Sequence, residues 1–262
     1  MKLIDCSACI GFGGINREIV NHENYFVYEK VNEPADAASL LSEMDFCGID
    51  GAAVYHQAMV DASPSYGNKR LLDELQTDKD KRLYSVLTWL PSISDDGFSV
   101  PHLRKAVKEN SLFGIRLMPQ ANRYMLDRIT CGDLLDYAGA AKLPVYLSPA
   151  YGWEYIFSVM KECPSLTVIL TNYGLWGSDR YFYPLVNAYK NVYIDTSDYQ
   201  EMRGIELFVR KFGSERMLFG TNYPKDNMGG PLSTLMQAKI PQSDRENIAH
   251  KNFERLYAEV KR

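Results

Sequence analysis

Short apolar runs alternate with longer stretches of helical spacing along the whole chain of 262 residues. The runs are rich in Val, Ile, Leu and Tyr, as in Thr-Val-Ile-Leu-Thr at residues 167–171. Such runs are typical of strands that are buried on both faces. The stretches between them are long enough for the helical crossovers that parallel strands need. The alternation therefore predicts an α/β protein with a parallel sheet.

Eight strands and eight helices are expected from this alternation. We predict strands over residues 2–6, 51–55, 83–88, 113–118, 144–148, 167–171, 192–196 and 216–220. We predict helices near residues 34–44, 69–75, 101–109, 131–141, 153–162, 181–189, 202–212 and 243–260. Right-handed crossovers allow eight such units to close on themselves, so the preferred fold is a (β/α)₈ TIM barrel over residues 1–262 as a single domain. A doubly wound open sheet is the alternative.

Three connections are expected at the face where the strands end. They cover residues 10–33, 58–67 and 120–129, and we interpret them as loops. Barrels of this kind build their sites on that face. These loops and the strand ends are therefore the places to search for functional residues.

Charge and composition argue against nucleic-acid binding, membrane insertion and secretion. The formal net charge is −4 and the pI is about 5.7, which argues against nucleic acid as a partner. No run of eighteen apolar residues is present, and the first residues do not resemble a secretory signal. Five cysteines, an odd number, suit reduced thiols. We therefore predict a cytoplasmic protein that binds neither nucleic acid nor membranes.

The short motifs exclude several common kinds of site. Residues three apart in a strand point to opposite faces, so Cys6 and Cys9 cannot share a metal ion or a disulfide unless the chain turns between them. A second cysteine pair for a zinc ribbon is missing from the sequence, as are a dinucleotide fingerprint, a P-loop and a Gly-x-Ser-x-Gly elbow. The four histidines form no metal-binding pair.

Characteristic segments lie at the ends of the expected strands, in order along the chain. They cover residues 4–9, 114–119, 144–148, 166–174, 191–195 and 217–224, and a closing segment at 247–256. Over almost the whole chain these segments resemble the amidohydrolase superfamily, specifically the amidohydrolase-related group of metal-dependent hydrolases and decarboxylases. The resemblance implies a TIM barrel with its active site at the mouth formed by the strand ends.

The chain departs from the family pattern at the metal ligands. The family ends strand one with Asp-x-His-x-His, strands five and six each with His, and strand eight with Asp. The matching positions here are Ser7, Cys9, Ser148, Asn172 and Asn222. Hydroxyl and amide oxygens bind Zn²⁺ far more weakly than imidazole or carboxylate, and Asn cannot move a proton. We therefore predict a degenerate metal site with no metal and no other cofactor, as in a pseudoenzyme.

Three residues are candidates for chemistry without a metal. Cys9 and His56, at the ends of adjacent strands, can form a thiolate–imidazole pair. A buried thiol and a hydrogen-bonded histidine are the favoured alternative, because no third group is visible that would orient the pair. Asp195, like Asp198 and Asp226, follows a strand and is a candidate base, although capping of a turn is the commoner role.

Arg116 is the main candidate for ligand binding, since a guanidinium can grip a carboxylate or phosphate through two hydrogen bonds. A structural ion pair with Asp195 or Asp198 is the alternative. Tyrosines near the strand ends suit either an aromatic floor for a ligand or ordinary packing. The other predicted ligand-binding residues are Ser7, Ser148, Asn172, Tyr173 and Asn222.

The preferred function is binding of a small polar or carboxylated molecule at the mouth of the barrel, in a protein that lacks the usual metal centre. A metal-independent hydrolase or lyase that uses Cys9, His56 or an aspartate is one alternative. A metal hydrolase with unconventional ligands is the other. The sequence leaves open whether the protein is an enzyme, because function is decided by the site and not by the fold. A homodimer is possible for a barrel of this kind.

Overall fold

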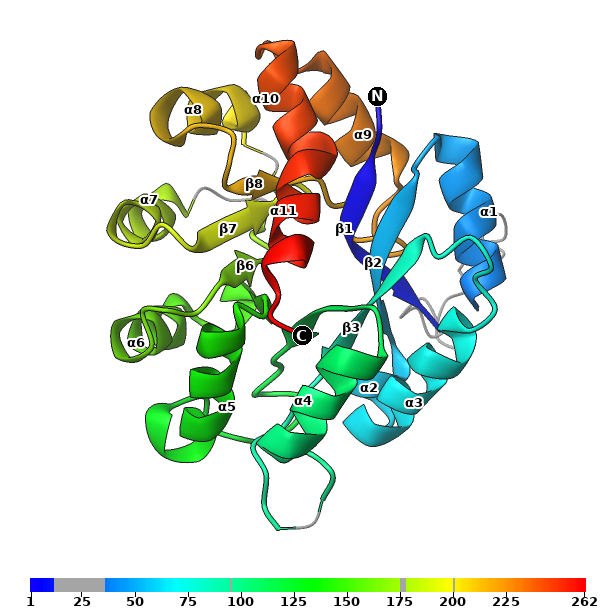
Figure 1. Ribbon diagram of the computed structural model, residues 1–262. Helices are drawn as coiled ribbons and strands as arrows, with labels where there is room; N and C mark the ends of the chain where they lie inside the picture. Colours follow the sequence, from blue (N-terminus) through cyan, green and yellow to red (C-terminus); the bar gives the residue numbers. More distant parts are fainter. Residues whose placement is uncertain (12–35, 95, 175–177, 200) are drawn as a thin grey trace, which may run out of the picture.

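The computed structural model describes residues 1–11, 36–94, 96–174, 178–199 and 201–262. Its eight strands form one parallel sheet in chain order, and the helices that connect them lie outside the ring of strands (Figure 1). The strands are β1 (Ile4–Ile10), β2 (Gly51–His56), β3 (Leu83–Thr88), β4 (Leu112–Arg116), β5 (Val145–Leu147), β6 (Val168–Leu170), β7 (Val192–Asp195) and β8 (Met217–Leu218).

The sheet closes into a barrel. The Cys6 amide donates to the Phe219 carbonyl at 2.8 Å, and the Cys9 amide donates to the Tyr223 carbonyl at 2.8 Å. These bonds join β1 to the segment around the end of β8. The predicted TIM barrel is therefore confirmed, and the open sheet is wrong.

The helices follow the prediction with local differences. Their bounds are α1 (Ala37–Cys47), α2 (Ala58–Asp61), α3 (Pro64–Leu75), α4 (Val100–Glu109), α5 (Arg128–Ala141), α6 (Trp153–Glu162), α7 (Asp179–Ala188), α8 (Gly204–Phe212), α9 (Gly229–Gln237), α10 (Gln242–Glu246) and α11 (Asn252–Glu259). A 3₁₀ turn, η2 (Pro149–Tyr151), follows β5, and a π-helix, η3 (Asn247–Lys251), joins α10 to α11. Within the described residues, no helix is both long enough and apolar enough to cross a bilayer.

Two of the expected loops and one helix need correction. Residues 58–67 contain α2 and the start of α3, whose first turn is capped by Ser63 accepting from the Tyr66 amide at 3.2 Å. Residues 120–129 include the first two residues of α5. The prediction missed α9, which begins with two glycines and so has a weak helical signal at its start. The connection at residues 10–33 lies almost wholly outside the described residues.

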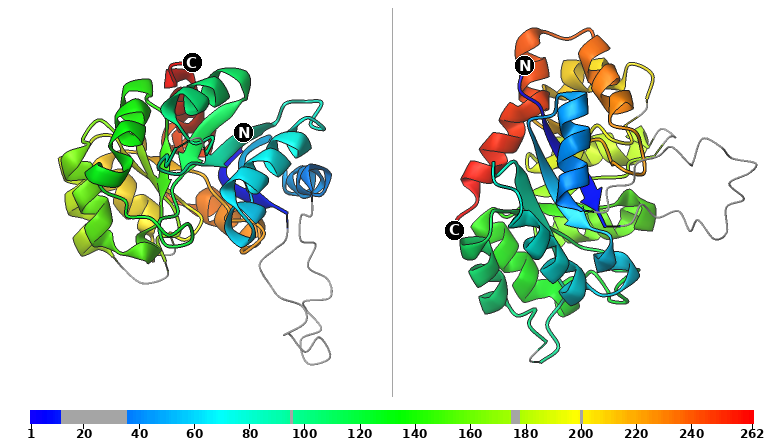
Figure 2. Two further views of the ribbon diagram at one scale, coloured as in Figure 1. Left: turned by 90° about the horizontal axis from the view of Figure 1, so that it is seen from below. Right: turned by 90° about the vertical axis from the view of Figure 1, so that its right-hand side faces the viewer.

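Aromatic packing fills the end of the barrel where the strands begin. The Phe253 ring of α11 stacks on Phe113 of β4 at 4.0 Å between ring centroids. Asn252 donates from its side-chain amide to the carbonyls of Ser214 and Met217, each at 2.8 Å, which ties α11 to β8. In both views of Figure 2, α11 and the end of β1 lie on opposite sides of the molecule. The opposite end, where the strands finish, is thus the one available for a site.

Candidate functional site

A cavity of about 100 Å³ lies where the strands end. Its lining includes Tyr55 of β2, Arg116 of β4 and Tyr146 of β5. Ser148 follows β5 and Asn172 follows β6 in the same lining. Because parallel strands all finish at the same face of a barrel, residues far apart in the sequence meet here.

Arg116 is the buried cation of this cavity, with an exposed fraction of 8%. Its guanidinium carbon lies 4.2 Å from the centroid of the Tyr55 ring and 5.2 Å from that of Tyr146. The Nε atom is buried and has no hydrogen-bond partner among the described residues. Neither Asp195 nor Asp198 forms an ion pair with it. The aromatic rings therefore hold the guanidinium in place without neutralising its charge.

Asp195, at the end of β7, is completely enclosed by protein. Its Oδ1 accepts from the Ser197 amide at 3.2 Å and from the Ser197 hydroxyl at 2.6 Å, whereas Oδ2 is buried without a partner. Burial raises the pKa of this carboxyl, and hydrogen bonding by Ser197 and Thr171 and the charge of Arg116 oppose the rise. Asp195 is not part of the cavity lining, so the structure places it behind the cavity wall.

Cys9 and His56 are bonded to other groups. The Cys9 thiol donates to the Ile10 carbonyl at 3.4 Å and contacts Gln57 Oε1 at 3.8 Å, and burial raises its pKa to about 12. His56 Nδ1 accepts from the Ala58 amide at 3.0 Å, and burial lowers its pKa. No hydrogen bond joins these two described side chains. The contacts favour the structural alternative for both residues, and a catalytic role stays a prediction.

The five positions that the sequence resemblance matches to metal ligands of the family carry hydroxyl, amide and thiol groups. Ser148 Oγ accepts from the Ala150 amide at 3.3 Å, and the Asn222 side-chain amide donates to Asp226 Oδ2 at 3.0 Å. Ser7 Oγ is buried with no partner among the described residues, and burial raises the pKa of the Cys9 thiol to about 12. Asn172 contributes only an amide. Across the described ranges, no group of three or more His, Cys, Asp or Glu is placed to hold a metal ion.

Three of the six predicted ligand-binding residues line the cavity: Arg116, Ser148 and Asn172. Ser7, Tyr173 and Asn222 lie outside the lining. The Tyr173 hydroxyl donates to Asp179 at 3.0 Å, and its ring packs edge-on against Trp153 and Tyr199. This tyrosine therefore belongs to an aromatic cluster under α7.

Several residues that line the cavity are not among the predicted site residues, and they include Tyr55, Gln57, Tyr146 and Lys225. Tyr55 and Tyr146 lie inside strand runs, where a tyrosine suits packing as well as binding. Lys225 directly follows the Asn222-Tyr-Pro segment after β8, and that position is the one signal that could have identified it.

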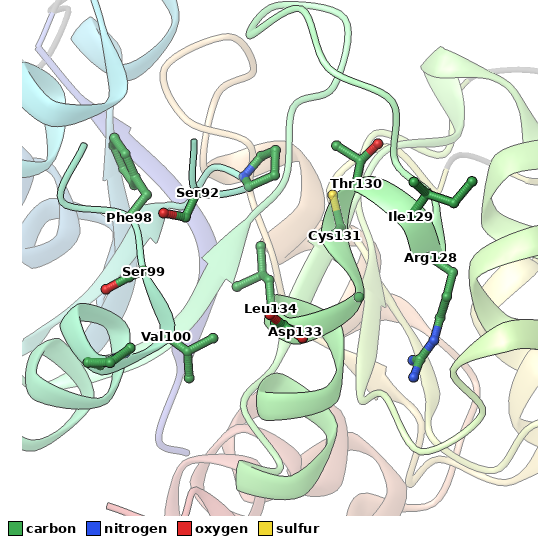
Figure 3. Close-up of a pocket in the computed structure, with 13 residues that line it drawn as sticks. Ser92, Phe98, Ser99, Val100, Arg128, Ile129, Thr130, Cys131, Asp133 and Leu134 are labelled. Atoms are coloured by element: carbon green, nitrogen blue, oxygen red, sulfur yellow. The ribbon is translucent and has the colours of Figure 1, made fainter. Parts of the chain in front are cut away.

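A second hollow of about 470 Å³ lies outside the barrel, between the starts of α4 and α5. Figure 3 shows Phe98, Ser99 and Val100 on one side of it and Ile129 and Arg128 on the other. The Arg128 guanidinium is held by both oxygens of Asp136, at 2.6 and 2.8 Å. Its charge is thus already paired, unlike that of Arg116.

A family model described as "Amidohydrolase" matches residues 35–258. The chain belongs to the amidohydrolase family. No curated protein matches the sequence. The match covers every strand of the barrel except β1, so the resemblance seen at the strand ends is confirmed.

Solved structures share the fold of this amidohydrolase. One is an uncharacterized TIM-barrel protein from Bordetella bronchiseptica, with 19% identity, a TM-score of 0.75 and full coverage of both chains. Another is a 5-carboxyvanillate decarboxylase from Sphingomonas paucimobilis, with 16% identity, a TM-score of 0.66 and coverage of 98% and 99%. A third is a probable 2-pyrone-4,6-dicarboxylic acid hydrolase from Acinetobacter baumannii, with 16% identity, a TM-score of 0.68 and coverage of 98% and 100%. At these identities the likeness concerns the fold alone.

Proposed function

We propose that this amidohydrolase-family barrel binds a small carboxylated molecule at its mouth, with Arg116 as the anchor. The supporting observation is a guanidinium that is 8% exposed, lines a cavity and lacks a carboxylate partner among the described residues. Burying a charge without a partner is costly. A ligand carboxylate in the cavity compensates this cost, and a protein that had no use for the charge would be expected to lose it.

The surroundings of Arg116 suit recognition of a carboxylate. Cation–π contacts with Tyr55 and Tyr146 use the face of the guanidinium, so its N–H groups remain available in the plane. A planar fork of donors matches a carboxylate through two hydrogen bonds. Ser148 and Asn172, which line the same cavity, add neutral donors. The site therefore combines one charged anchor with weaker polar contacts, as small-molecule sites commonly do.

The proposal includes no metal-dependent step. Hydroxyl and amide groups occupy four of the five positions that the resemblance matches to metal ligands, and Cys9 at the fifth offers one soft ligand where three or four are required. Chemistry by Cys9 or His56 is not part of the proposal either, because neither residue lines the cavity. We place the protein in the cytoplasm, which is supported by five free cysteines. A homodimer stays a prediction.

Metal analysis tests the first part of this proposal. We expect the purified chain, incubated with Zn²⁺ and Mn²⁺ and then dialysed, to retain far less than one metal ion per chain. The reason is that neutral oxygen donors hold these ions weakly. Inductively coupled plasma mass spectrometry measures the retained metal. Near-stoichiometric retention contradicts the proposal and indicates a metal hydrolase with unconventional ligands.

Calorimetric titration tests the second part. We expect small monocarboxylates such as butyrate to bind, and the matched primary amides to bind about tenfold more weakly or worse, because hydrogen bonds to a charged partner are stronger than neutral ones. Isothermal titration calorimetry of each pair measures the ratio. Equal binding of acid and amide, or binding of neither, contradicts a role for Arg116 as a carboxylate anchor.

A further inference from the structure

The described lining of the cavity carries two cations and no carboxylate. The cations are Arg116 and Lys225, and the other lining residues are neutral. Neither side chain forms an ion pair with a described residue. A small cavity with walls of one charge sign concentrates ligands of the opposite sign. The lining therefore favours a ligand with more than one negative charge.

The two cations come from opposite sides of the barrel. Arg116 ends β4, whereas Lys225 follows β8, and these strands are four apart in a ring of eight. Arg116 is buried and Lys225 is exposed, so one charge lies at the floor and the other at the rim. Two charges placed this way suit two separate anionic groups better than a single group clamped from both sides.

The backbone of Lys225 is fixed by the turn that follows β8. Its amide donates to the Asn222 carbonyl at 3.0 Å. Two acidic groups interact with this segment: Asp226 accepts from the Asn222 side chain, and Asp198 lies close enough to Lys225 for the lysine charge to act on it. Burial and the charges of Asp195 and Asp226 raise the pKa of Asp198 to about 6, and the charge of Lys225 opposes that rise. Because Lys225 is exposed and forms no ion pair with a described residue, its ammonium group can reach a ligand at the rim.

We propose that the ligand is a compact molecule with two separated anionic groups, one bound by Arg116 and the other by Lys225. This inference rests on the proposed function. The cavity is small, about 100 Å³, so the body between the two groups is a short carbon chain. The first group is a carboxylate, and the second is a carboxylate or a phosphate-type group.

The test compares three ligands of similar length: butyrate, succinate and 3-phosphonopropanoate. Calorimetric titration of the full chain is expected to show both dianions binding about tenfold more tightly than butyrate, because each adds one charge-assisted contact. In Lys225→Met, the ratio of succinate to butyrate affinity is expected to fall from about tenfold to near one. The matched control is Lys239→Met, which removes an exposed lysine remote from the cavity and is expected to leave the ratio unchanged.

The outcomes separate this inference from the proposed function. If butyrate binds but succinate binds no better, the two-anion inference is overturned and the carboxylate site stands. If the preference for dianions survives in Lys225→Met, the inference is overturned because another group supplies the second contact. If none of the three ligands binds, the proposed function itself fails. A preference for one dianion over the other supports the inference and identifies the second group as a carboxylate or a phosphate-type anion.

Discussion

Replacing Arg116 with Met is expected to lower the affinity for small carboxylates by about 30-fold or more. This corresponds to a loss of about 2 kcal/mol or more, in the range measured for charged hydrogen bonds whose partner is removed in a desolvated site. The guanidinium is the only buried cation among the described residues that line the cavity. No neighbouring group offers the same planar set of N–H donors. Isothermal titration calorimetry with butyrate measures the loss.

The same substitution is expected to leave the barrel at least as stable as the original. A Met side chain fits between the rings of Tyr55 and Tyr146, and its sulfur makes favourable contacts with aromatic rings. It also removes a buried charge that has no partner among the described residues, which costs free energy in the unliganded protein. Urea denaturation should therefore give an unchanged or larger free energy of unfolding, which separates loss of binding from loss of folding.

Two further variants show whether the effect is specific to the site. Arg116→Lys keeps the charge but loses the planar fork, so we expect an intermediate loss of affinity. Arg104 lies over the Tyr137 ring at 5.6 Å on the outside of the barrel, and Arg104→Met removes an aromatic-bound arginine remote from the cavity. That control is expected to bind like the original protein. Full affinity in Arg116→Met would show that another group anchors the carboxylate.

The sequence pattern predicted the barrel because its strands are buried on both faces. The run at β6 is apolar throughout and that at β3 is largely apolar, so a strand buried between the barrel interior and the helices was the natural interpretation. The end of β1 was placed too early, since Asp5 and Ser7 interrupt the apolar run. In the structure, a shift of register between Asp5 and Ala8 lets β1 continue to Ile10. The two buried polar residues Asp5 and Ser7 hid this continuation from the pattern.

The site was only partly visible in the sequence. Arg116 stood out because a charge inside an apolar strand run needs a reason. Tyr55 and Tyr146 did not stand out, since a tyrosine in a strand suits packing as well as contact with a cation. Lys225 was missed because an exposed lysine in a loop carries no signal of its own. Which strand ends face one another is decided by closure of the barrel, and local patterns do not contain that information.

Asp5 joins the two strands that close the barrel. Its Oδ1 accepts from the amides of Ser7 and Thr221 at 2.9 and 3.0 Å, and its Oδ2 accepts from the Thr221 hydroxyl. The carboxyl is completely buried, and burial raises its pKa from 3.8 to about 6 in spite of these bonds. The native protein therefore holds a proton here at pH values where the unfolded chain has released it.

This shift predicts a loss of stability as pH rises. Between pH 3.8 and about 6 the native state binds more protons at Asp5 than the unfolded state, so the free energy of unfolding falls through that window and levels off above it. A change from 3.8 to about 6 corresponds to about 3 kcal/mol. Urea denaturation between pH 4.5 and 7.5 measures this contribution when the original protein is compared with Asp5→Asn.

Asp5→Asn is expected to be more stable than the original at pH 7.5 by about 1 to 3 kcal/mol, and the advantage is expected to shrink toward pH 4.5. An Asn oxygen can accept from both backbone amides, and its NH₂ can donate to the Thr221 oxygen once that hydroxyl turns. Asp195 and Asp198, whose pKa values are also raised by burial, titrate in both proteins, so the difference between them reports on Asp5 and on its interaction with the Asp195 charge.

Asp5→Leu is the opposite control, because it leaves the two amides without an acceptor and is expected to destabilise the barrel at every pH. A parallel pH dependence in Asp5→Asn and the original would show that Asp5 is ionised in the native state with an ordinary pKa. The side-chain hydrogen bonds of Asp5 to described residues run to Ser7 and Thr221. The carboxyl therefore ties β1 to the segment that follows β8.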